Sequence, residues 1–220
     1  MSTWAVLVAA GRGERLGEDR PKAFVRLGKL PLLAEPLRRL DESEWVDNVV
    51  VVAPSGWEEP AILLAEEIGA SKVSACVTGG ETRTESVRAG VGDVPEEAAV
   101  ILVHDAARPL LPGELVPRLL AKLGEGFDGA VPGLPPRDTV KRVDGDVVVE
   151  TLARDGLVGV QTPQAFVAPV LRAALGRGTE GTDCASLVEA AGGRVAVVDG
   201  HDHLLKVTTR ADLDLVASWL

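Results

Sequence analysis

The chain has 220 residues, 46% of them hydrophobic, so it is long and apolar enough to bury the core of an α/β domain. Its formal charge of -10 is spread along the sequence, and a net-negative surface argues against general binding to nucleic acid or to anionic membranes, which both need a basic face. The two cysteines, Cys76 and Cys184, are far apart and match no metal-binding spacing, which disfavours a disulfide or a structural metal and fits a reducing cytoplasm.

The first half of the chain alternates short valine-rich runs with helical patterns. The first run, Trp4–Ala10, is short and has no positive residue before it, which indicates a buried strand rather than a signal peptide, and no stretch is long enough to span a bilayer. Further strands are expected at Asn48–Ala53, Val73–Val77, Ala99–His104 and Gly129–Pro132, with helices around Leu32–Leu40, Glu58–Ile68, Thr82–Val91 and Glu114–Leu123. Because the strands are apolar almost throughout, we predict an open, mostly parallel, doubly wound (Rossmann-like) sheet with ligands at the carboxyl ends of its strands.

A hairpin interrupts this α/β pattern. Two β-prone runs, Thr139–Val143 and Val147–Thr151, flank the turn Asp144-Gly145, and Asp-Gly between alternating runs is a strong hairpin signal. An inserted hairpin should project from the body as an arm. The chain then resumes with Val158–Gln161, two helical stretches, a strand at Arg194–Val198 and a final helix from about Arg210. We therefore predict one domain over residues 1–220, with a β-arm at about 137–154.

The loop after the first strand is rich in glycine and carries two cations. It reads Ala9-Ala10-Gly11-Arg12-Gly13-Glu14-Arg15-Leu16-Gly17 and is followed by Pro21-Lys22. Glycines let backbone N–H groups approach phosphate oxygens, and Arg15 and Lys22 add positive charge, although a flexible strand–helix connection would look similar. The loop has no Gly-Lys-Ser/Thr, and Leu16 stands where a dinucleotide fingerprint needs its third glycine, so both of those readings are disfavoured.

Two later loops also follow predicted strands. The first, Gly79-Gly80-Glu81-Thr82-Arg83-Thr84-Glu85-Ser86, joins two glycines to a helix N-terminus, which suits a base edge or a phosphate, although a simple N-cap by Thr82 would leave the same pattern. The second, His104-Asp105-Ala106-Ala107-Arg108-Pro109, places a carboxylate where a strand ends. Asp105 is then a candidate ligand for Mg²⁺ beside nucleotide phosphates, or a helix cap, and His104 a candidate for a hydrogen bond within the core.

The second half of the chain contributes further polar residues: Arg137–Lys141, Arg154, Gln161–Gln164, Thr182-Asp183 and Lys206–Thr208. Individually these are typical surface residues, but together they offer hydroxyls and cations suited to a phosphorylated polyol. His201-Asp202-His203 lies in a polar turn without a third ligand at a defined spacing, so a metal site there is disfavoured. No Gly-x-Ser-x-Gly elbow supports serine-hydrolase chemistry.

With these motifs in order, the chain resembles the 2-C-methyl-D-erythritol 4-phosphate cytidylyltransferase family of the non-mevalonate isoprenoid pathway. The resemblance runs from Val6 to Leu213 and rests on Ala-Ala-Gly-x-Gly-x-Arg, Pro-Lys, Gly-Gly-x-x-Arg-x-x-Ser-Val, His-Asp-Ala-Ala-Arg-Pro, Asp-Thr-Val-Lys, Thr-Pro-Gln, Thr-Asp and Lys-Val-Thr. It implies a nucleotidyltransferase-type fold and the Mg²⁺-dependent transfer of CMP from CTP to methylerythritol phosphate, with release of pyrophosphate. It also implies a homodimer in which each arm embraces the other subunit.

The resemblance also implies roles for the matching residues. Arg15 and Lys22 would stabilise the transition state at the α-phosphate. CTP would contact Ala9, Ala10, Gly11, Gly13, Gly80, Arg83, Ser86, Asp105 and Ala106, with Asp105 near the metal. The substrate phosphate and polyol would contact Arg154, Lys206, Thr139, Thr162, Thr182 and Arg108, of which Thr139 and Arg154 flank the arm and would complete the pocket of the opposite subunit. The substrate phosphate is already a nucleophile, so positioning and charge stabilisation suffice without a general base.

Three positions depart from the family pattern, and two alternatives stay open. Ala23 stands where the family usually has Gln, Cys184 where it has Glu, and Leu204-Leu205 where it has Asn-Ile. None of these changes removes a charged catalytic group. The alternatives are another polyol-phosphate cytidylyltransferase, such as one for ribitol phosphate, and a non-catalytic nucleotide-binding regulator, which the presence of Arg15 and Lys22 disfavours.

Overall fold

A mostly parallel sheet forms the centre of the computed structural model, which describes residues 2–11, 13, 16–17 and 19–220. Within this part of the chain the sheet has eight strands in the order β10-β7-β11-β6-β1-β4-β5, with β12 also paired to β7. The strands are β1 (Thr3–Val8), β4 (Asn48–Ala53), β5 (Val73–Thr78), β6 (Val100–Asp105), β7 (Gly129–Leu134), β10 (Gly159–Val160), β11 (Gln164–Val167) and β12 (Val195–Asp199). The predicted strands are thus present, with ends shifted by one or two residues, and Asp105 is the last residue of β6.

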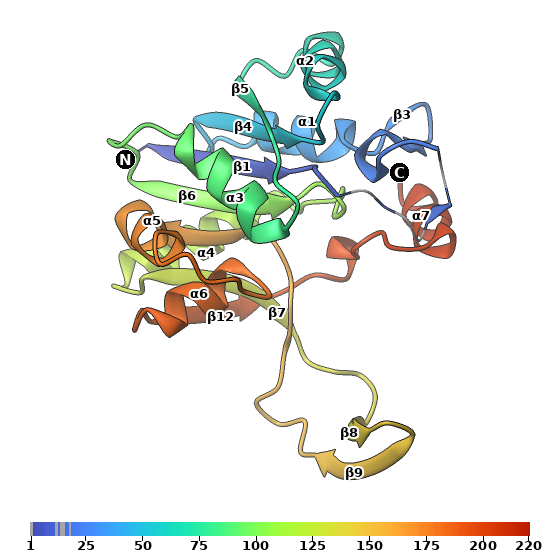
Figure 1. Ribbon diagram of the computed structural model, residues 1–220, viewed down its shortest axis with the longest axis vertical. Coiled ribbons are helices and arrows are strands. Elements are labelled where there is room, and N and C mark those ends of the chain that lie inside the picture. The colour runs from blue at the N-terminus through green and yellow to red at the C-terminus, as the bar shows by residue number, and fades with distance from the viewer. Residues whose placement is uncertain (1, 12, 14–15, 18) are drawn as a thin grey trace.

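Helices cover both faces of this sheet, as its apolar strands predict (Figure 1). Successive side chains of β1 alternate, so that Leu7 lies in one core and Val6 in the other. The first core is shared with α1 (Ala34–Glu42), α2 (Glu58–Glu67) and α4 (Leu115–Gly124), and the second with α3 (Arg83–Gly92), α5 (Ala168–Leu175) and α6 (Cys184–Ala190). The doubly wound α/β prediction is therefore confirmed. No helix in the described part of the chain has the length and apolar character needed to cross a membrane.

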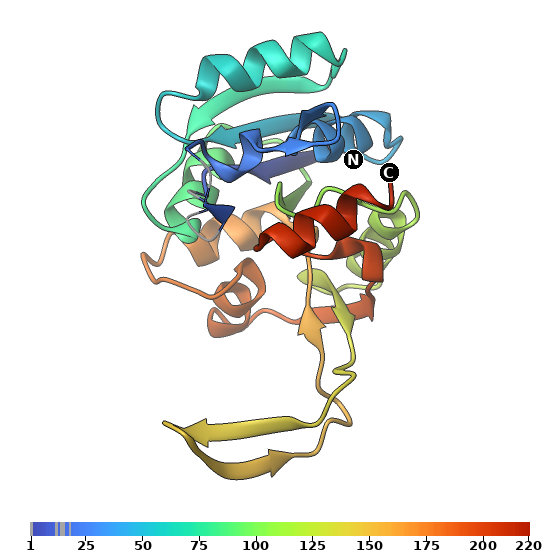
Figure 2. The same cartoon turned by 90° about the vertical axis from the view of Figure 1, so that its right-hand side faces the viewer.

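The last helix lies beside the first loops of the chain, far from its sequence neighbours. Helix α7 (Arg210–Ala217) buries Leu213 and Val216 in a third apolar cluster, together with Val25 and Leu27 of the region around β2 (Arg26–Leu27) and β3 (Leu30–Pro31). Figures 1 and 2 both show the C-terminal helix next to this short hairpin. The packing brings the segment before α7 to the carboxyl ends of β1 and β6.

Strand β11 is the main departure from the sequence prediction. It runs antiparallel between β6 and β7 in the middle of the sheet. Its first residue and the residues just before it were expected at the surface, yet Gln161, Thr162 and Gln164 are only 7%, 4% and 1% exposed. The chain that returns from the arm enters the sheet here, and a strand of four residues is too short for its periodicity to be recognised.

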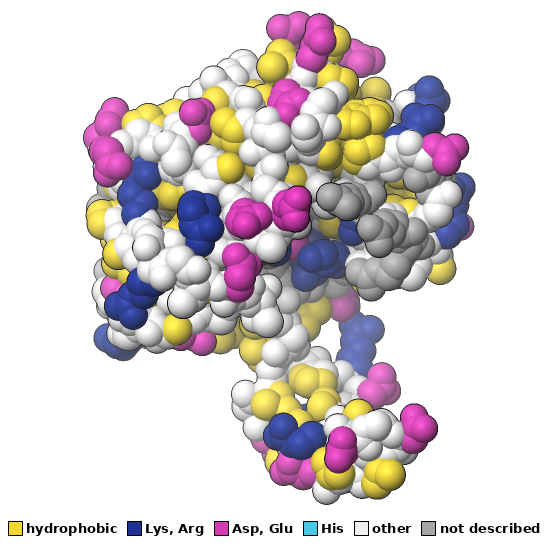
Figure 3. Space-filling view, viewed as in Figure 1, with side chains coloured by type: hydrophobic (Ala, Val, Ile, Leu, Met, Phe, Trp, Pro, Cys, Tyr) yellow, Lys and Arg dark blue, Asp and Glu magenta, His cyan; other side chains and the backbone are white. Residues whose placement is uncertain are grey.

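The predicted hairpin is present and projects from the body of the molecule (Figures 1 and 2). Its strands β8 (Val140–Asp144) and β9 (Val147–Leu152) pair antiparallel, and Gly145 takes a φ of 55° in the turn between them. Four valines on the arm are more than half exposed: Val143, Val147, Val148 and Val149. Figure 3 shows apolar and charged side chains mixed on the visible face of the arm.

Candidate functional site

A cavity of about 240 Å³ opens at the carboxyl ends of β1 and β6, beside the start of α3. This is the edge at which ligands of doubly wound sheets bind. Ten of the predicted site residues line it: Ala9, Ala10, Gly11, Lys22, Gly80, Arg83, Ser86, Asp105, Ala106 and Lys206. Five more were not predicted: Val8, Ala23, Glu81, Thr82 and Ala107. The sequence motifs already contained Glu81, Thr82 and Ala107, and Ala23 was noted as a departure from the family pattern, whereas Val8 is marked only by its position before Ala9.

The glycines of the first two loops allow this close assembly. A Cβ at Gly79 would overlap the Cβ of Ala10, and one at Gly80 would overlap the Cβ of Glu85. Gly11 is different, because no described atom lies within 4 Å of the position its Cβ would take. The first two glycines are therefore required by packing within the protein, whereas Gly11 leaves open space at the cavity wall.

The N-terminus of α3 is capped, as the simpler interpretation of this loop predicted. The Thr82 hydroxyl accepts a hydrogen bond from the backbone N–H of Glu85 at 3.1 Å, and the Glu85 carboxylate accepts one from the backbone N–H of Thr82 at 3.1 Å. This reciprocal capping box fixes the first turn of the helix. Arg83, the first helical residue, is thereby directed at the end of β6.

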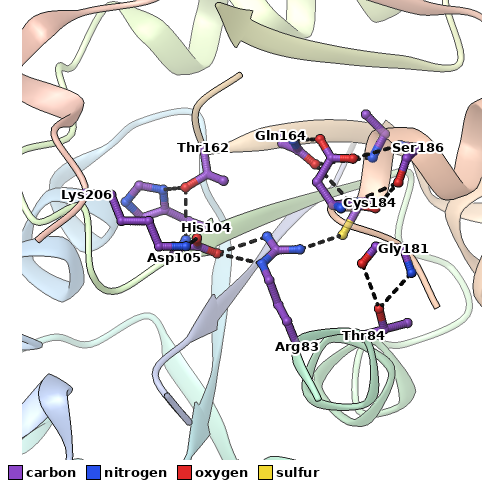
Figure 4. Close-up of polar contacts among 12 residues, drawn as sticks. Arg83, Thr84, His104, Asp105, Thr162, Gln164, Gly181, Cys184, Ser186 and Lys206 are labelled. Atoms are coloured by element: carbon purple, nitrogen blue, oxygen red, sulfur yellow. Dashed lines mark hydrogen bonds and ion pairs between the residues drawn. The ribbon is translucent and has the colours of Figure 1, made fainter. Parts of the chain in front are cut away.

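Asp105 lies between two cations (Figure 4). Its Oδ1 accepts hydrogen bonds from Nε and Nη2 of Arg83 at 3.0 and 2.9 Å, and its Oδ2 contacts Nζ of Lys206 at 2.8 Å. Burial by itself would raise the pKa of Asp105, but the charges of Arg83 and Lys206 outweigh that effect and hold the pKa well below its ordinary range. The carboxylate is therefore ionised at neutral pH, and the two cations concentrate positive charge at the cavity of an acidic protein.

His104 forms its hydrogen bonds inside the core. Its ring is fully buried, with Nδ1 3.1 Å from the hydroxyl of Thr162 and Nε2 3.0 Å from the backbone carbonyl of Arg108. Burial lowers the pKa of His104 to about 4, so the ring is neutral at physiological pH. The Thr162 hydroxyl also accepts a hydrogen bond from the backbone N–H of Asp105 at 3.0 Å. The Thr162 hydroxyl is thus buried and bonded to protein groups, and its contact with the substrate stays a prediction.

The start of α6 lies against Arg83. Nη1 of Arg83 is 3.7 Å from Sγ of Cys184, and burial raises the pKa of this thiol to about 11, so that it is neutral. The side-chain oxygen of Gln164 accepts hydrogen bonds from the backbone N–H groups of Cys184 and Ala185 at 3.2 and 3.3 Å. The preceding Thr182 is exposed and is not among the described residues that line the cavity.

Lys22 occupies a short 3-10 helix (Lys22–Phe24) beside the C-terminal segment. Its Nζ donates a hydrogen bond to the backbone carbonyl of Val207 at 3.0 Å. Gly13 lies next to it, and a Cβ there would come within 2.6 Å of the Lys22 Cβ. Arg15, the other predicted catalytic cation, lies outside the described residues.

Three further predicted residues are not brought to the cavity within one chain. Thr139 and Arg154 are exposed at the root of the arm, where the Arg154 guanidinium donates a hydrogen bond to the backbone carbonyl of Arg137 at 2.8 Å. Arg108 directs Nη1 at the backbone carbonyl of Leu204, and burial lowers its pKa. For Thr139 and Arg154 this separation agrees with their expected position beside the arm, whereas for Arg108 it was not expected.

The donor set for a metal ion is small. Among the described residues, no group of three or more His, Cys, Asp or Glu side chains is placed to hold a metal ion. The turn with His201 and His203 therefore forms no such group either. The cavity offers Asp105 and the exposed Glu81. Mg²⁺ commonly takes one or two carboxylates and completes its shell with water and substrate phosphates. The residues present therefore fit Mg²⁺ that is carried largely by a nucleotide.

Comparisons with known proteins show which family this chain is similar to. A family model described as 2-C-methyl-D-erythritol 4-phosphate cytidylyltransferase matches residues 3–220. Proteins of that name from Nocardia farcinica and Saccharopolyspora erythraea are each 44% identical, and the alignments cover 100% of this chain and 94% and 100% of the relatives. The chain is also similar to the crystal structure of the protein of that name from Thermus thermophilus, with a TM-score of 0.80, 32% identity and coverage of 100% and 98% of the two chains. A 4-diphosphocytidyl-2C-methyl-D-erythritol synthase from Anaerococcus prevotii gives a TM-score of 0.85 at 25% identity, with coverage of 99% and 97%.

Proposed function

The chain belongs to the 2-C-methyl-D-erythritol 4-phosphate cytidylyltransferase family, and from this premise we propose how its residues perform the reaction. The enzyme transfers CMP from CTP to 2-C-methyl-D-erythritol 4-phosphate. A phosphate oxygen of the acceptor forms a bond to the α-phosphorus of CTP, the bond from that phosphorus to the bridging oxygen of the β-phosphate breaks, and pyrophosphate leaves. The observation that carries the assignment of the site is Asp105 held between Arg83 and Lys206 in a glycine-lined cavity at the carboxyl edge of the sheet.

The nucleotide lies against the two glycine-containing loops in this proposal. Ala9, Ala10 and Gly11 follow β1, and Gly80 precedes α3, so small residues line both walls. Backbone groups there can approach a base edge or a phosphate closely, and the N-terminus of α3 favours negative charge. Hydrogen bonds from backbone groups to the cytosine edge would reject bases that leave those groups unpaired.

The cations of the cavity act on the phosphates. Lys22 stabilises the charge that develops at the α-phosphate, and Lys206 holds the acceptor phosphate near it. By the family resemblance, Arg15 shares the task of Lys22. The acceptor phosphate is an ionised nucleophile, so the reaction needs orientation and electrostatic stabilisation and no group that abstracts a proton.

Magnesium is the cofactor that we propose. Its support is the chemistry of the site, because Asp105 is ionised and lies at a cavity suited to phosphates. When bound, the ion would neutralise charge on the triphosphate and polarise its phosphorus–oxygen bonds. Asp105 would be its protein ligand, while Arg83 and Lys206 hold the carboxylate in place.

A second copy of the chain completes the site in this proposal. The arm exposes Val143, Val147 and Val149, and an isolated two-stranded ribbon is only marginally stable in water, so it needs a surface to cover. A two-fold dimer lets each arm cover the other subunit. Thr139 and Arg154, which lie at the root of the arm and outside the cavity of their own chain, would then reach the substrate in the partner's cavity.

The environment we propose is the cytoplasm, without nucleic acid or membrane partners. The formal charge of -10 is unfavourable for both polyanionic partners. Cys76 and Cys184 are free thiols, which suits a reducing compartment. Figure 3 shows acidic and basic side chains interspersed over the visible face of the body.

Release of pyrophosphate tests the reaction and its substrates together. Purified enzyme with Mg²⁺ is given CTP, UTP, ATP or GTP, each combined with methylerythritol phosphate, ribitol phosphate or glycerol phosphate. We expect efficient release only from CTP with methylerythritol phosphate. Preference for ribitol phosphate would support the other cytidylyltransferase, and CTP binding without release on any acceptor would support a regulator.

A further inference from the structure

Two buried residues outside the cavity lining determine how the end of β6 is held. The register that pairs Gln164 with Val103 places Thr162 opposite Asp105, two residues beyond the end of the ladder between β11 and β6. At this position the Thr162 hydroxyl accepts the hydrogen bond from the backbone N–H of Asp105. The Thr162 side chain thus takes the place of the backbone carbonyl that would accept this hydrogen bond if the pairing of β11 with β6 continued.

The proton positions in this network follow from the chemistry of its members. The backbone carbonyl of Arg108 can only accept, so Nε2 of His104 carries a proton and donates it. The neutral ring then has a lone pair on Nδ1, and the Thr162 hydroxyl donates to it while accepting from Asp105. A directed chain therefore runs from the Asp105 N–H through the Thr162 hydroxyl to His104, and on to Arg108.

This chain ties together both ends of the turn that follows β6. The backbone N–H of Arg108 donates to the carbonyl of Asp105 at 2.9 Å, which closes the turn through Ala106 and Ala107. His104 connects the two ends of the same turn. Its Nε2 bonds to the backbone carbonyl of Arg108, and its Nδ1 bonds to the Thr162 hydroxyl, which in turn bonds to the backbone N–H of Asp105. Ala106 and Ala107 line the cavity, so the hydrogen bonds of His104 and Thr162 fix the position of this part of the cavity wall. They also fix the direction of the Asp105 side chain.

We infer that Thr162 and His104 are positioning residues for the nucleotidyl transfer. Thr162 acts through Asp105, whose carboxylate it aims at Arg83, Lys206 and the nucleotide. His104, in its Nε2-protonated form, holds the Thr162 hydroxyl in the orientation that accepts from Asp105. This inference rests on the proposed role of Asp105 in catalysis.

A double-mutant cycle separates action through Asp105 from direct contact with the substrate. Thr162→Val removes the hydroxyl at nearly constant volume, and Thr162→Ser is the matched control that keeps it. In single-turnover assays with CTP and methylerythritol phosphate, we expect Thr162→Val to slow the reaction about tenfold or more, as loss of an orienting hydrogen bond often does, and Thr162→Ser to stay within about threefold of the parent. In an Asp105→Asn background the same Thr162→Val change should cost less than about twofold.

Each outcome of this cycle has one meaning. Equal losses from Thr162→Val in both backgrounds would overturn the inference and return Thr162 to direct substrate contact. A parent-like rate for Asp105→Asn would instead contradict the proposed role of Asp105 while leaving the assignment of the reaction intact. A loss from Thr162→Ser as large as that from Thr162→Val would show that volume, not the hydroxyl, matters, and would also overturn the inference.

Hydrogen exchange tests the network without turnover. In the folded Thr162→Val protein, the amide of Asp105 loses its acceptor, so its exchange should become at least about tenfold faster, while the amide of Val103 in the same strand keeps its protection. Thr162→Ser should leave both amides as in the parent. Unchanged exchange at Asp105 in Thr162→Val would contradict the geometry on which the inference depends.

Discussion

Lys22 and Val207 are 185 residues apart in the sequence, yet Nζ of Lys22 donates a hydrogen bond to the carbonyl of Val207 at 3.0 Å. The backbone N–H of Val207 donates in turn to the carbonyl of Ala107 at 2.8 Å, and the adjacent Lys206 contacts Asp105. The C-terminal segment therefore links the loop after β1 to the loop after β6. It closes one side of the cavity and delivers a cation to it.

Replacement of Lys22 tests the proposed stabilisation of the transition state. We expect Lys22→Ala to lower kcat by about 100-fold or more, which is typical for loss of a preorganised charge donor, while CTP affinity falls less. Steady-state kinetics and calorimetric titration of CTP measure the two effects. Lys29→Ala, which removes an exposed lysine of the same region, is the matched control and should change neither. A parent-like kcat at saturating substrates would refute the role of Lys22.

A methyl group at Gly11 should interfere with the nucleotide and not with the fold. No described atom lies within 4 Å of the position a Cβ would take there, so Gly11→Ala is expected to leave the midpoint of thermal unfolding nearly unchanged. CTP affinity should fall about tenfold or more, because the nucleotide is proposed to approach this backbone. Gly92→Ala, also without a neighbouring atom and at the far end of α3, is the control. Unchanged CTP affinity in Gly11→Ala would place the nucleotide elsewhere.

The sequence is informative where a residue's environment follows from local pattern. The valine-rich strands were predicted because buried parallel strands are apolar on both faces, and Asp105 and Arg83 were found because each lies next to a strand or helix end. Their pairing through one carboxylate depends on the neighbouring positions of β1, β5 and β6, which no local pattern encodes. The burial of Thr162 was not expected for the same reason, since only the path of the chain back from the arm makes it a buried partner of His104.

Protonation of His104 should limit stability in acid. Asp105 and Arg108 are the charged groups beside this ring, and burial lowers the pKa of His104 to about 4 from an ordinary value of about 6.5. Between these values the unfolded chain binds the proton and the folded chain does not, so the free energy of unfolding falls as the pH falls from about 6.5 to about 4, by up to about 3 kcal/mol. Denaturant unfolding across this pH range measures the slope. His104→Asn removes the titrating ring, and an equally steep slope in that variant would assign the effect to other groups.

Removal of the arm tests whether it holds two subunits together. A chain in which Val140–Glu150 is replaced by a short glycine linker loses the exposed valines of the hairpin. We expect it to sediment as a monomer that still binds CTP, because the described cavity residues lie outside the arm, but that has lost nearly all turnover. Four Val→Thr changes at Val143, Val147, Val148 and Val149 keep the hairpin and remove only its apolar surface. A parent protein that sediments as a fully active monomer would rule out the dimer.

Mixing two inactive variants tests whether the arm of one subunit serves the cavity of the other. In a chain with Lys22→Ala the cavity is defective, and in a chain with Arg154→Ala the arm root is defective. If Arg154 acts in the partner's cavity, each hybrid dimer has one site with both residues intact, so an equal mixture should recover up to about a quarter of the parent activity. Exchange of subunits is verified by mass spectrometry with one chain isotopically labelled. Two Lys22→Ala preparations mixed in the same way are the control and should remain inactive. Proven exchange without recovery would place Lys22 and Arg154 in the site of one chain, contrary to their separation in this structure.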